Sequence, residues 1–199
     1  MEKHASTQET VRGQNVFEWY EALISAALVL VLVFSLFFRI IQVDGESMVP
    51  TLQNGDKLIV WGAGYEPQRG DVVIVDSYTA YGKPLVKRVI AKGGQTVRID
   101  CQTGTVFVDG KQLTERYAVL LDSAGHDSGV VQQYPTYGYD RETRMFEVTV
   151  PEGHLFVMGD NRNGSTDSRD SRLGMVDERY ILGHVQSVVF PISDFGTVK

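Results

Sequence analysis

An uncharged apolar run near the N-terminus is the feature that most limits what this chain can become. Residues 22–38 (ALISAALVLVLVFSLFF) contain no charged side chain and only two serines. A helix of this length spans roughly 26 Å, close to the about 30 Å of a bilayer core. Trp19 and Tyr20 precede the run, where aromatic residues mark a membrane interface. We therefore predict a transmembrane anchor helix over residues 17–41.

Two other interpretations of this run fit less well. A helix that is apolar on all sides belongs in a protein core, but β-rich domains rarely bury one of this length. A cleavable signal peptide has an apolar region of about 7–15 residues followed by a small-x-small pair. Here the run is longer, no such pair follows, and Ile40 and Ile41 extend it if Arg39 snorkels its guanidinium to the headgroups. Basic residues flank both ends of the run, so the positive-inside rule leaves its orientation open.

Beyond Gln42 the sequence changes to short alternating or β-branched runs separated by turn residues. Such runs predict strands at residues 57–61, 71–76, 85–90, 96–99, 106–108, 146–150, 155–158 and 184–190. Helical periodicity is weak, and only residues 177–181 offer one short turn. We predict a mostly β fold, with a domain of several antiparallel sheets over residues 42–199 preceded by one transmembrane helix.

Two segments lack this patterning. Residues 1–14 are mostly polar without apolar periodicity, and we predict a short disordered tail there. Residues 116–144 hold Gly, Tyr, Asp and Ser with little order. Loops of that length are uncommon inside a compact domain, so we predict a long insertion that runs over the surface.

Composition excludes several classes of function. The net charge of −6 disfavours nucleic acid as a partner. The single cysteine, Cys101, cannot form an internal disulfide, and no Cys/His cluster has metal-ligand spacing. The Asp-rich stretch 160–169 lacks the spacing of an EF-hand calcium loop. We expect no metal and no cofactor.

A serine in a turn follows the apolar run. Ser47 lies between Gly45, which tolerates unusual backbone angles, and Pro50, which fixes its own φ. A serine held in this way is positioned rather than mobile, which suits a nucleophile that has a base within hydrogen-bond reach. Taken alone, the same pattern describes a capped turn.

A lysine interrupts an apolar strand. Lys87 and Arg88 point to opposite faces of the strand predicted at residues 85–90, so one of them faces inward. A lysine in an apolar cleft loses the solvation of its charged form, and its pKa falls. The neutral amine then accepts a proton near neutral pH. Taken alone, the segment also fits a lysine on a solvated strand face.

The third polar segment is GDNRNGSTDSR, residues 159–169, which follows a predicted strand. It is dense in side chains that form hydrogen bonds, and it fits either a solvated turn or a set of Asp/Arg pairs. Reciprocal pairing of carboxylates with guanidinium groups is the more natural use, because such pairs brace a site.

Together these segments resemble a known family. The chain reads SMxPTL at residues 47–52, RGDVV at 69–73, VKRVI at 86–90 and MGDNR at 158–162, followed by SxDSR at 165–169. Their order, their spacing and the preceding anchor resemble the membrane-bound type I signal peptidases of bacteria, over about residues 17–191. The resemblance implies a single-pass enzyme of the cell membrane, with a cytoplasmic tail at residues 1–16 and an extracytoplasmic catalytic domain at 42–199.

The resemblance also implies a serine–lysine dyad, a variant of the serine-protease triad. Ser47 matches the nucleophile that forms the acyl-enzyme, and Lys87 matches the general base. The serine that matches Ser165 bonds and orients the lysine amine in family members. The matches of Asp167 and Arg169 form a supporting salt bridge.

Further positions carry over less directly. Asp160 and Arg162 match residues that hold the architecture of the site. The Ser47 N–H is implied as one oxyanion donor, and Gly45 stands where some members have a serine whose hydroxyl assists the oxyanion. The Asp-Ser-Arg sequence is repeated at 170–172. We assign the first copy, at 167–169, because it lies nearer to the preceding motif.

The substrates implied are secreted preproteins, cleaved after small-x-small (Ala-x-Ala-like) motifs at the bilayer surface. We predict that shallow pockets admit alanine and exclude larger side chains. Four apolar residues near the dyad in the sequence are the candidates to line them: Met48, Leu52, Val86 and Val89.

Other functions are compatible with parts of the sequence. A Ser-His-Asp hydrolase would use His126, His154 or His184, each of which has an ordinary place in a loop or at a strand end. A membrane-anchored β domain that binds partners without catalysis is a second alternative. Self-cleaving repressor proteases also use serine and lysine, but they carry a DNA-binding domain in place of an anchor.

Overall fold

The computed structural model describes residues 2–77 and 81–198, apart from the side chains of residues 2–16 and 36. The chain divides into two units, Met1–Phe38 and Arg39–Lys199.

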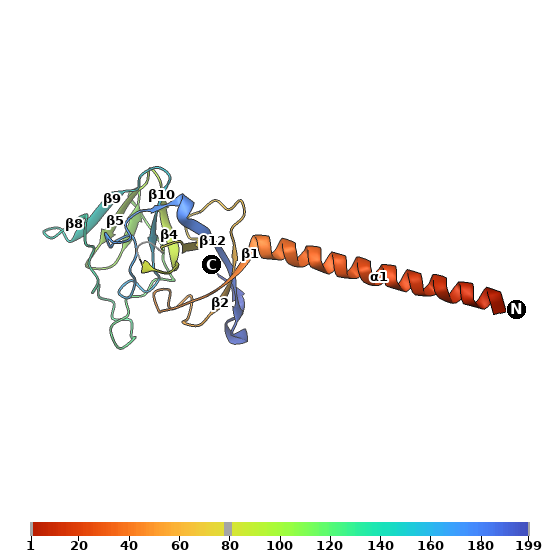
Figure 1. The fold of residues 1–199 in the computed structure, drawn as a ribbon. Helices are drawn as coiled ribbons and strands as arrows, with labels where there is room; N and C mark the ends of the chain where they lie inside the picture. Colours follow the sequence, from red (N-terminus) through yellow and green to blue (C-terminus); the bar gives the residue numbers. More distant parts are fainter. Residues whose placement is uncertain (1, 78–80, 199) are drawn as a thin grey trace. The chain divides into compact units, whose positions relative to one another are not determined.

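The first unit is one helix, α1, over Glu2–Phe37 (Figure 1). Within it, Phe17–Ser35 is long and apolar enough to cross a membrane, and its side chains are exposed. The tail predicted to be disordered forms the first turns of this helix from Glu2 onward. The reason is that no proline interrupts the stretch, and extending a helix by good formers such as Ala, Glu and Gln is easier than starting one.

The helix ends earlier than the predicted anchor. Strand β1 covers Phe38–Gln42, so Ile40 and Ile41 belong to a strand and the prediction of helix up to residue 41 is wrong. Ile41 packs against the core of the second unit, next to strand β2, which is the neighbour of β1 in the sheet. β-branched residues suit a pleated, half-buried surface, and here tertiary pairing decides between helix and strand.

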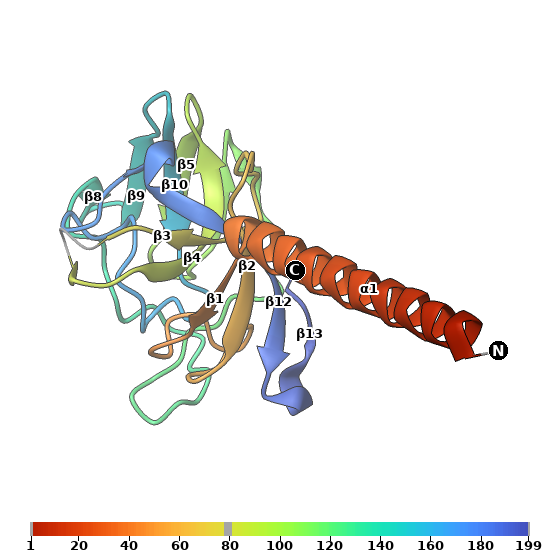
Figure 2. The same ribbon diagram turned by 45° about the vertical axis from the view of Figure 1, so that its right-hand side comes forward.

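The second unit is mostly β, as predicted, and consists of two sheets (Figures 1 and 2). The larger sheet has the order β1-β2-β12-β3-β4-β10-β11, with β13 beside β12. Its further strands are β2 (Lys57–Trp61), β3 (Val72–Val75), β4 (Leu85–Lys92), β10 (His154–Met158), β11 (Val176–Asp177), β12 (Ile181–Phe190) and β13 (Gly196–Thr197). The smaller sheet has the order β7-β6-β5-β9-β8. Its strands are β5 (Thr96–Asp100), β6 (Val106–Val108), β7 (Lys111–Gln112), β8 (Tyr139–Asp140) and β9 (Met145–Thr149).

The predicted strands all appear, with shifts of a few residues at some ends. The predicted short turn is the 3₁₀ helix η1 (Glu178–Tyr180), and a second one, η2 (Ile192–Asp194), follows β12. Strand β12 begins three residues before its predicted start and pairs with both β2 and β3. A side chain at Gly183 would come within 2.5 Å of the Trp61 carbonyl oxygen, so this close pairing requires glycine.

Apolar side chains of the two sheets meet in one cluster. It contains Ile90 and Phe156 from the larger sheet, and Val97, Val106 and Phe146 from the smaller one. A second cluster lies along β2, β3 and β12. As a result β4 is buried over most of its length, and a polar group on this strand is removed from water.

The insertion at residues 116–144 is not a plain surface loop. Val131 is buried, and strand β8 pairs with β9. Near its start Val119 forms a parallel bridge with Asn161. The segment therefore contacts the Asp-rich loop that follows β10, which the sequence did not reveal.

Phe146 provides a test of this packing. Its ring is fully buried and lies 5.7 Å from the Tyr137 ring and 5.6 Å from the Phe156 ring, centroid to centroid. We expect Phe146→Ala to lower the free energy of unfolding by about 3–5 kcal/mol, because it removes apolar contacts and leaves a cavity. Urea unfolding of the full chain in detergent measures this change. A loss below about 1 kcal/mol would contradict the assignment of Phe146 to the core.

Candidate functional site

The turn after β1 carries Ser47 to strand β4 of the larger sheet. Met48 and Leu52 are buried and fix the turn to the core. Gly45 adopts φ +111°, which favours glycine, and its N–H donates to the Asn54 side chain at 2.9 Å. Ser47 is thus fixed from both directions along the chain: Gly45 before it is held by a hydrogen bond, and Met48 and Leu52 after it are buried in the core.

Strand β4 brings Lys87 to this serine. The Lys87 Nζ lies 2.8 Å from Ser47 Oγ and 2.9 Å from the Val86 carbonyl oxygen. Only 2% of Lys87 is exposed. Arg88, on the opposite face of the strand, is buried as well, so both basic residues of the predicted strand lie inside the protein.

Burial determines the protonation of the lysine. It lowers the pKa of Lys87 from 10.5 to about 8, because the charged amine loses its solvation. The charge of Asp167 opposes this shift, and the charge of Arg169 reinforces it. A neutral amine, which can accept a proton, is therefore accessible near physiological pH.

The loop after β10 lies directly behind the nucleophile. The Asn161 N–H donates to the Ser47 carbonyl oxygen at 3.1 Å. A Cβ atom at Gly159 would collide with that same oxygen and with the Ser165 hydroxyl. Glycine at this position therefore permits the close approach of the loop to the serine turn.

Asp160 joins the loop to β4 and to the serine turn. Its carboxylate accepts hydrogen bonds from Arg88 at 2.9 and 2.7 Å and from the Thr51 hydroxyl at 2.5 Å. Arg88 and Asp160 are both buried. Breaking such a pair would leave a buried charge without a partner, so the contact fixes the relative position of three segments.

Asp167 and Arg169 form a second buried pair, with 2.7 Å between Nη2 and Oδ2. Burial alone would raise the pKa of the Asp167 carboxyl, but the Arg169 charge and hydrogen bonds from Arg169 and the Gly159 N–H hold it below its ordinary value. The other copy of the motif pairs Asp170 with Arg172, whose side chain is 67% exposed. The first copy is therefore the one that lies within the buried site.

Ser165 departs from its expected role. The resemblance implies that it bonds the lysine amine, yet the buried Ser165 Oγ makes no described hydrogen bond to that amine; its hydroxyl instead helps to lower the pKa of the Asp167 carboxyl. The Lys87 amine donates to Ser47 Oγ and to the Val86 carbonyl oxygen. In this structure the amine is therefore oriented by its own strand and by the nucleophile.

Arg162 has a partner that the sequence did not indicate. Its guanidinium forms a bidentate pair with Glu115, at 2.7 and 3.2 Å, and donates to the Gly159 carbonyl oxygen at 3.0 Å. Burial alone would lower the pKa of Arg162, but the Glu115 carboxylate more than offsets this and raises it. No local pattern links residues this far apart in the sequence.

A cavity of about 200 Å³ lies beside Ser47 and Lys87. Its apolar lining includes Ile41, Met48 and Val86. Leu52 and Val89, which we predicted in the substrate pocket, do not line it; both are fully buried in core clusters. Apolar residues that lie near a site in the sequence can fill either the core or a pocket. On β4 the two faces decide: Val86 lines the cavity, and Val89 on the other face packs in the core.

The backbone N–H of Ser47 is the predicted oxyanion donor. The Ser47 N–H has no acceptor among the described residues. The Gly45 N–H, by contrast, is already bonded to the Asn54 side chain, so it is not free to replace the serine hydroxyl that assists the oxyanion in some family members.

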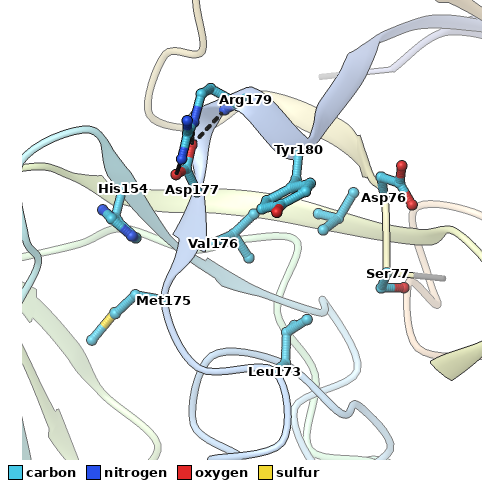
Figure 3. A pocket seen from close by; sticks show the side chains of 10 residues that line it. Asp76, Ser77, His154, Leu173, Met175, Val176, Asp177, Arg179 and Tyr180 are labelled. Carbon is cyan, nitrogen blue, oxygen red and sulfur yellow. Dashed lines mark hydrogen bonds and ion pairs between the residues drawn. The ribbon is translucent and has the colours of Figure 1, made fainter. Parts of the chain in front are cut away.

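The histidines lie elsewhere. His126 is largely exposed in the insertion, and His184 stacks on Tyr65. His154 lines a separate cavity of about 340 Å³ near the end of β3, where Figure 3 shows it beside the Asp177–Arg179 ion pair. None of the three contacts Ser47 among the described residues, which leaves a Ser-His-Asp arrangement without its base.

Comparison with known proteins identifies the chain. The family model "Signal peptidase, peptidase S26" matches residues 16–190, which places the chain among the peptidases. Similar proteins include the signal peptidase I of Bacillus licheniformis, 35% identical over 94% of this chain and 95% of the relative. Signal peptidase I T of Bacillus subtilis (strain 168) is 34% identical over 100% and 98%. A probable signal peptidase I-1 of Synechocystis is 35% identical over 87% and 83%.

The chain is thus a serine protease with a β-rich domain after an N-terminal apolar helix. It belongs to the signal peptidase I family, whose members remove signal peptides.

The burial of Lys87 has a consequence for stability. Its pKa is lower in the folded than in the unfolded state, so wild-type stability rises as pH increases from about 8 to 10.5. We expect Lys87→Met to be more stable than the wild type below pH 8, by up to about 3 kcal/mol, because it buries no charge. Unfolding in detergent at pH 7 and at pH 10.5 measures the difference, which should shrink at the higher pH. If Lys87→Met is less stable than the wild type at pH 7, the burial of the Lys87 amine does not cost the free energy argued here.

Proposed function

We propose that Ser47 is the nucleophile and Lys87 the general base of a membrane-anchored endopeptidase that cleaves preproteins after small-x-small motifs. One observation carries this proposal: the amine nitrogen of Lys87 lies 2.8 Å from the Ser47 hydroxyl oxygen, and the lysine residue is only 2% exposed. This separation is within hydrogen-bond reach for proton transfer. The lowered pKa of Lys87, about 8, makes the neutral amine available.

The reaction follows from this geometry. The neutral Lys87 amine takes the proton of the Ser47 hydroxyl as Oγ bonds to the scissile carbonyl carbon. The Ser47 N–H stabilises the developing oxyanion. The Lys87 ammonium then gives its proton to the leaving nitrogen, which becomes the amino terminus of the mature protein. A water molecule, deprotonated by Lys87, attacks the acyl-enzyme carbonyl carbon. As the bond to Ser47 Oγ breaks, Lys87 returns that proton to Oγ, and the signal peptide leaves with a free carboxyl group.

The cavity beside the dyad is a candidate site for the residues that precede the cleaved bond. It holds about 200 Å³, and Ile41, Met48 and Val86 contribute apolar walls. Apolar walls of this kind suit small apolar side chains such as alanine. We propose that this cavity receives the small residues that precede the cleaved bond.

The anchor accounts for access to the substrate. The ten residues from Phe37 to Ser47 reach at most about 35 Å. With α1 in a bilayer, the nucleophile stays near the membrane surface, where a signal peptide emerges, and tethering raises the effective concentration of enzyme and substrate. We propose a single-pass topology with the β-rich unit on the extracytoplasmic side.

The proposal is tested with a preprotein that carries an Ala-x-Ala site, incubated with the full chain in detergent. We expect Ser47→Ala, Lys87→Ala and Lys87→Arg each to lower cleavage by at least about 10³-fold, because arginine keeps the charge but is not a base near neutral pH. The wild-type kcat/KM should rise through a pKa near 8 as Lys87 loses its proton.

Two controls accompany this experiment. Lys92→Ala, at the far end of the same strand, and His154→Ala, in the separate cavity, should keep wild-type activity. Replacing the last alanine of the substrate motif by leucine should block cleavage. A folded Lys87→Ala enzyme that still cleaves the preprotein would end the proposal.

A further inference from the structure

We propose that residues 115–119, hereafter the strut, hold the nucleophile Ser47 and the base Lys87 in the relative position that the reaction requires. Glu115 and Tyr117 are the positioning residues. The strut opens the insertion, to which the sequence assigned no role. The inference rests on the proposed function, because it concerns the alignment of Ser47 with Lys87.

On one side the strut is bonded to the loop that follows β10, behind the nucleophile. Glu115 holds Arg162 through the bidentate pair described above, with the two side chains only 8% and 3% exposed. The Val119 N–H donates to the Asp160 carbonyl oxygen at 2.9 Å, and its own carbonyl accepts from the Arg162 N–H at 2.8 Å. Two side-chain bonds and two backbone bonds thus tie the strut to a stretch of three residues.

That stretch in turn holds the nucleophile. Asn161 lies between the two tied residues, and its N–H donates to the Ser47 carbonyl oxygen at 3.1 Å. Its side-chain amide donates to the Glu46 carbonyl oxygen at 3.3 Å. A shift of the loop would therefore move the backbone that carries the nucleophilic oxygen.

On the other side the strut contacts the strand of the base. The Tyr117 ring covers the Arg88 guanidinium, whose Cζ is 4.0 Å from the ring centroid. Arg88 follows Lys87 directly on β4, and it also donates to the Gly70 carbonyl oxygen at 2.7 Å. A desolvated cation over an aromatic face is held electrostatically as well as by contact. The ring therefore fixes the strand one residue away from the base.

Tyr117 also connects the two sides. Its hydroxyl donates to the Glu115 carboxylate at 3.0 Å. Burial and the Glu115 charge raise the pKa of Tyr117, so the hydroxyl keeps its proton and remains a donor. A single chain of contacts then runs from Arg162 through Glu115 and Tyr117 to Arg88. Arg88 follows Lys87 on β4, and Arg162 follows Asn161, which holds the Ser47 carbonyl oxygen.

The consequence is kinetic. Proton transfer and attack require the reacting atoms within a few tenths of an ångström, and a displacement of about 1 Å costs up to about 10²-fold in rate. The strut touches neither the cavity beside Ser47 nor its lining residues. Its loss should therefore reduce kcat and leave KM for the preprotein unchanged.

The test compares variants of the full chain in detergent, each assayed well below its own melting temperature. We expect Tyr117→Leu and Glu115→Gln each to lower kcat about tenfold, with KM within about twofold of the wild type. Tyr117→Phe keeps the ring over Arg88 and should recover most of the activity. Tyr134→Phe is the matched control, because this half-exposed tyrosine lies in the same insertion and contacts Tyr139.

The outcomes separate this inference from the proposed function. If Ser47→Ala and Lys87→Ala are inactive but folded Tyr117→Leu and Glu115→Gln keep kcat within twofold of the wild type, the dyad stands and the strut has no positioning role. A rise in KM at constant kcat would also overturn it, since that pattern marks a binding contact. Should Tyr117→Leu fail to fold, Glu115→Gln, which keeps the size of the side chain, decides the question.

Discussion

The proposed chemistry of the β-rich unit depends on one lysine amine that the fold keeps out of water. Strand β4 lies inside the larger sheet, between β3 and β10, and is covered by core clusters. Lys87 reaches from this strand to Ser47, with 2.8 Å between the nitrogen and the hydroxyl oxygen. A charged amine is unfavourable in this place, so its pKa falls to about 8. The fold thereby makes the amine available as the base of the proposed mechanism.

The other buried charges show how selective this arrangement is. Three arginines share the interior of the site, and each has its own carboxylate: Arg88 with Asp160, Arg162 with Glu115, and Arg169 with Asp167. Among the buried cations of the described residues, Lys87 alone lacks a carboxylate within ion-pair distance. Pairing keeps the arginines charged and fixed, while the unpaired lysine is free to lose its proton. The same interior thus holds permanent cations that give rigidity and one that titrates.

The sequence predicts the fold class well, because strands alternate and turn residues separate them; the bounds of Lys57–Trp61 and Val106–Val108 agree with the structure. The sequence-based prediction fails where the same residues suit two different local structures. Ile40 and Ile41 fit a membrane helix or a strand, and pairing beside β2 decides. Leu52 and Val89 are apolar like a pocket lining, yet they fill the core.

Long-range pairing is the part of the site that no local pattern carries. Ser47 and Lys87 stand out through their own surroundings and through the motifs of the family. Glu115 and Tyr117 come from a segment without periodicity, and only the folded chain brings them to Arg162 and Arg88.

The state of the Lys87 amine is the central claim, and titration of that amine by NMR tests it most directly. The full chain in detergent, labelled at lysine and compared with Lys87→Met to assign the signal, gives the pKa of this one group. We expect a pKa near 8, well below that of an ordinary lysine. A value at or above 10.5 would mean that the amine is charged at neutral pH and solvated, and it would contradict the account.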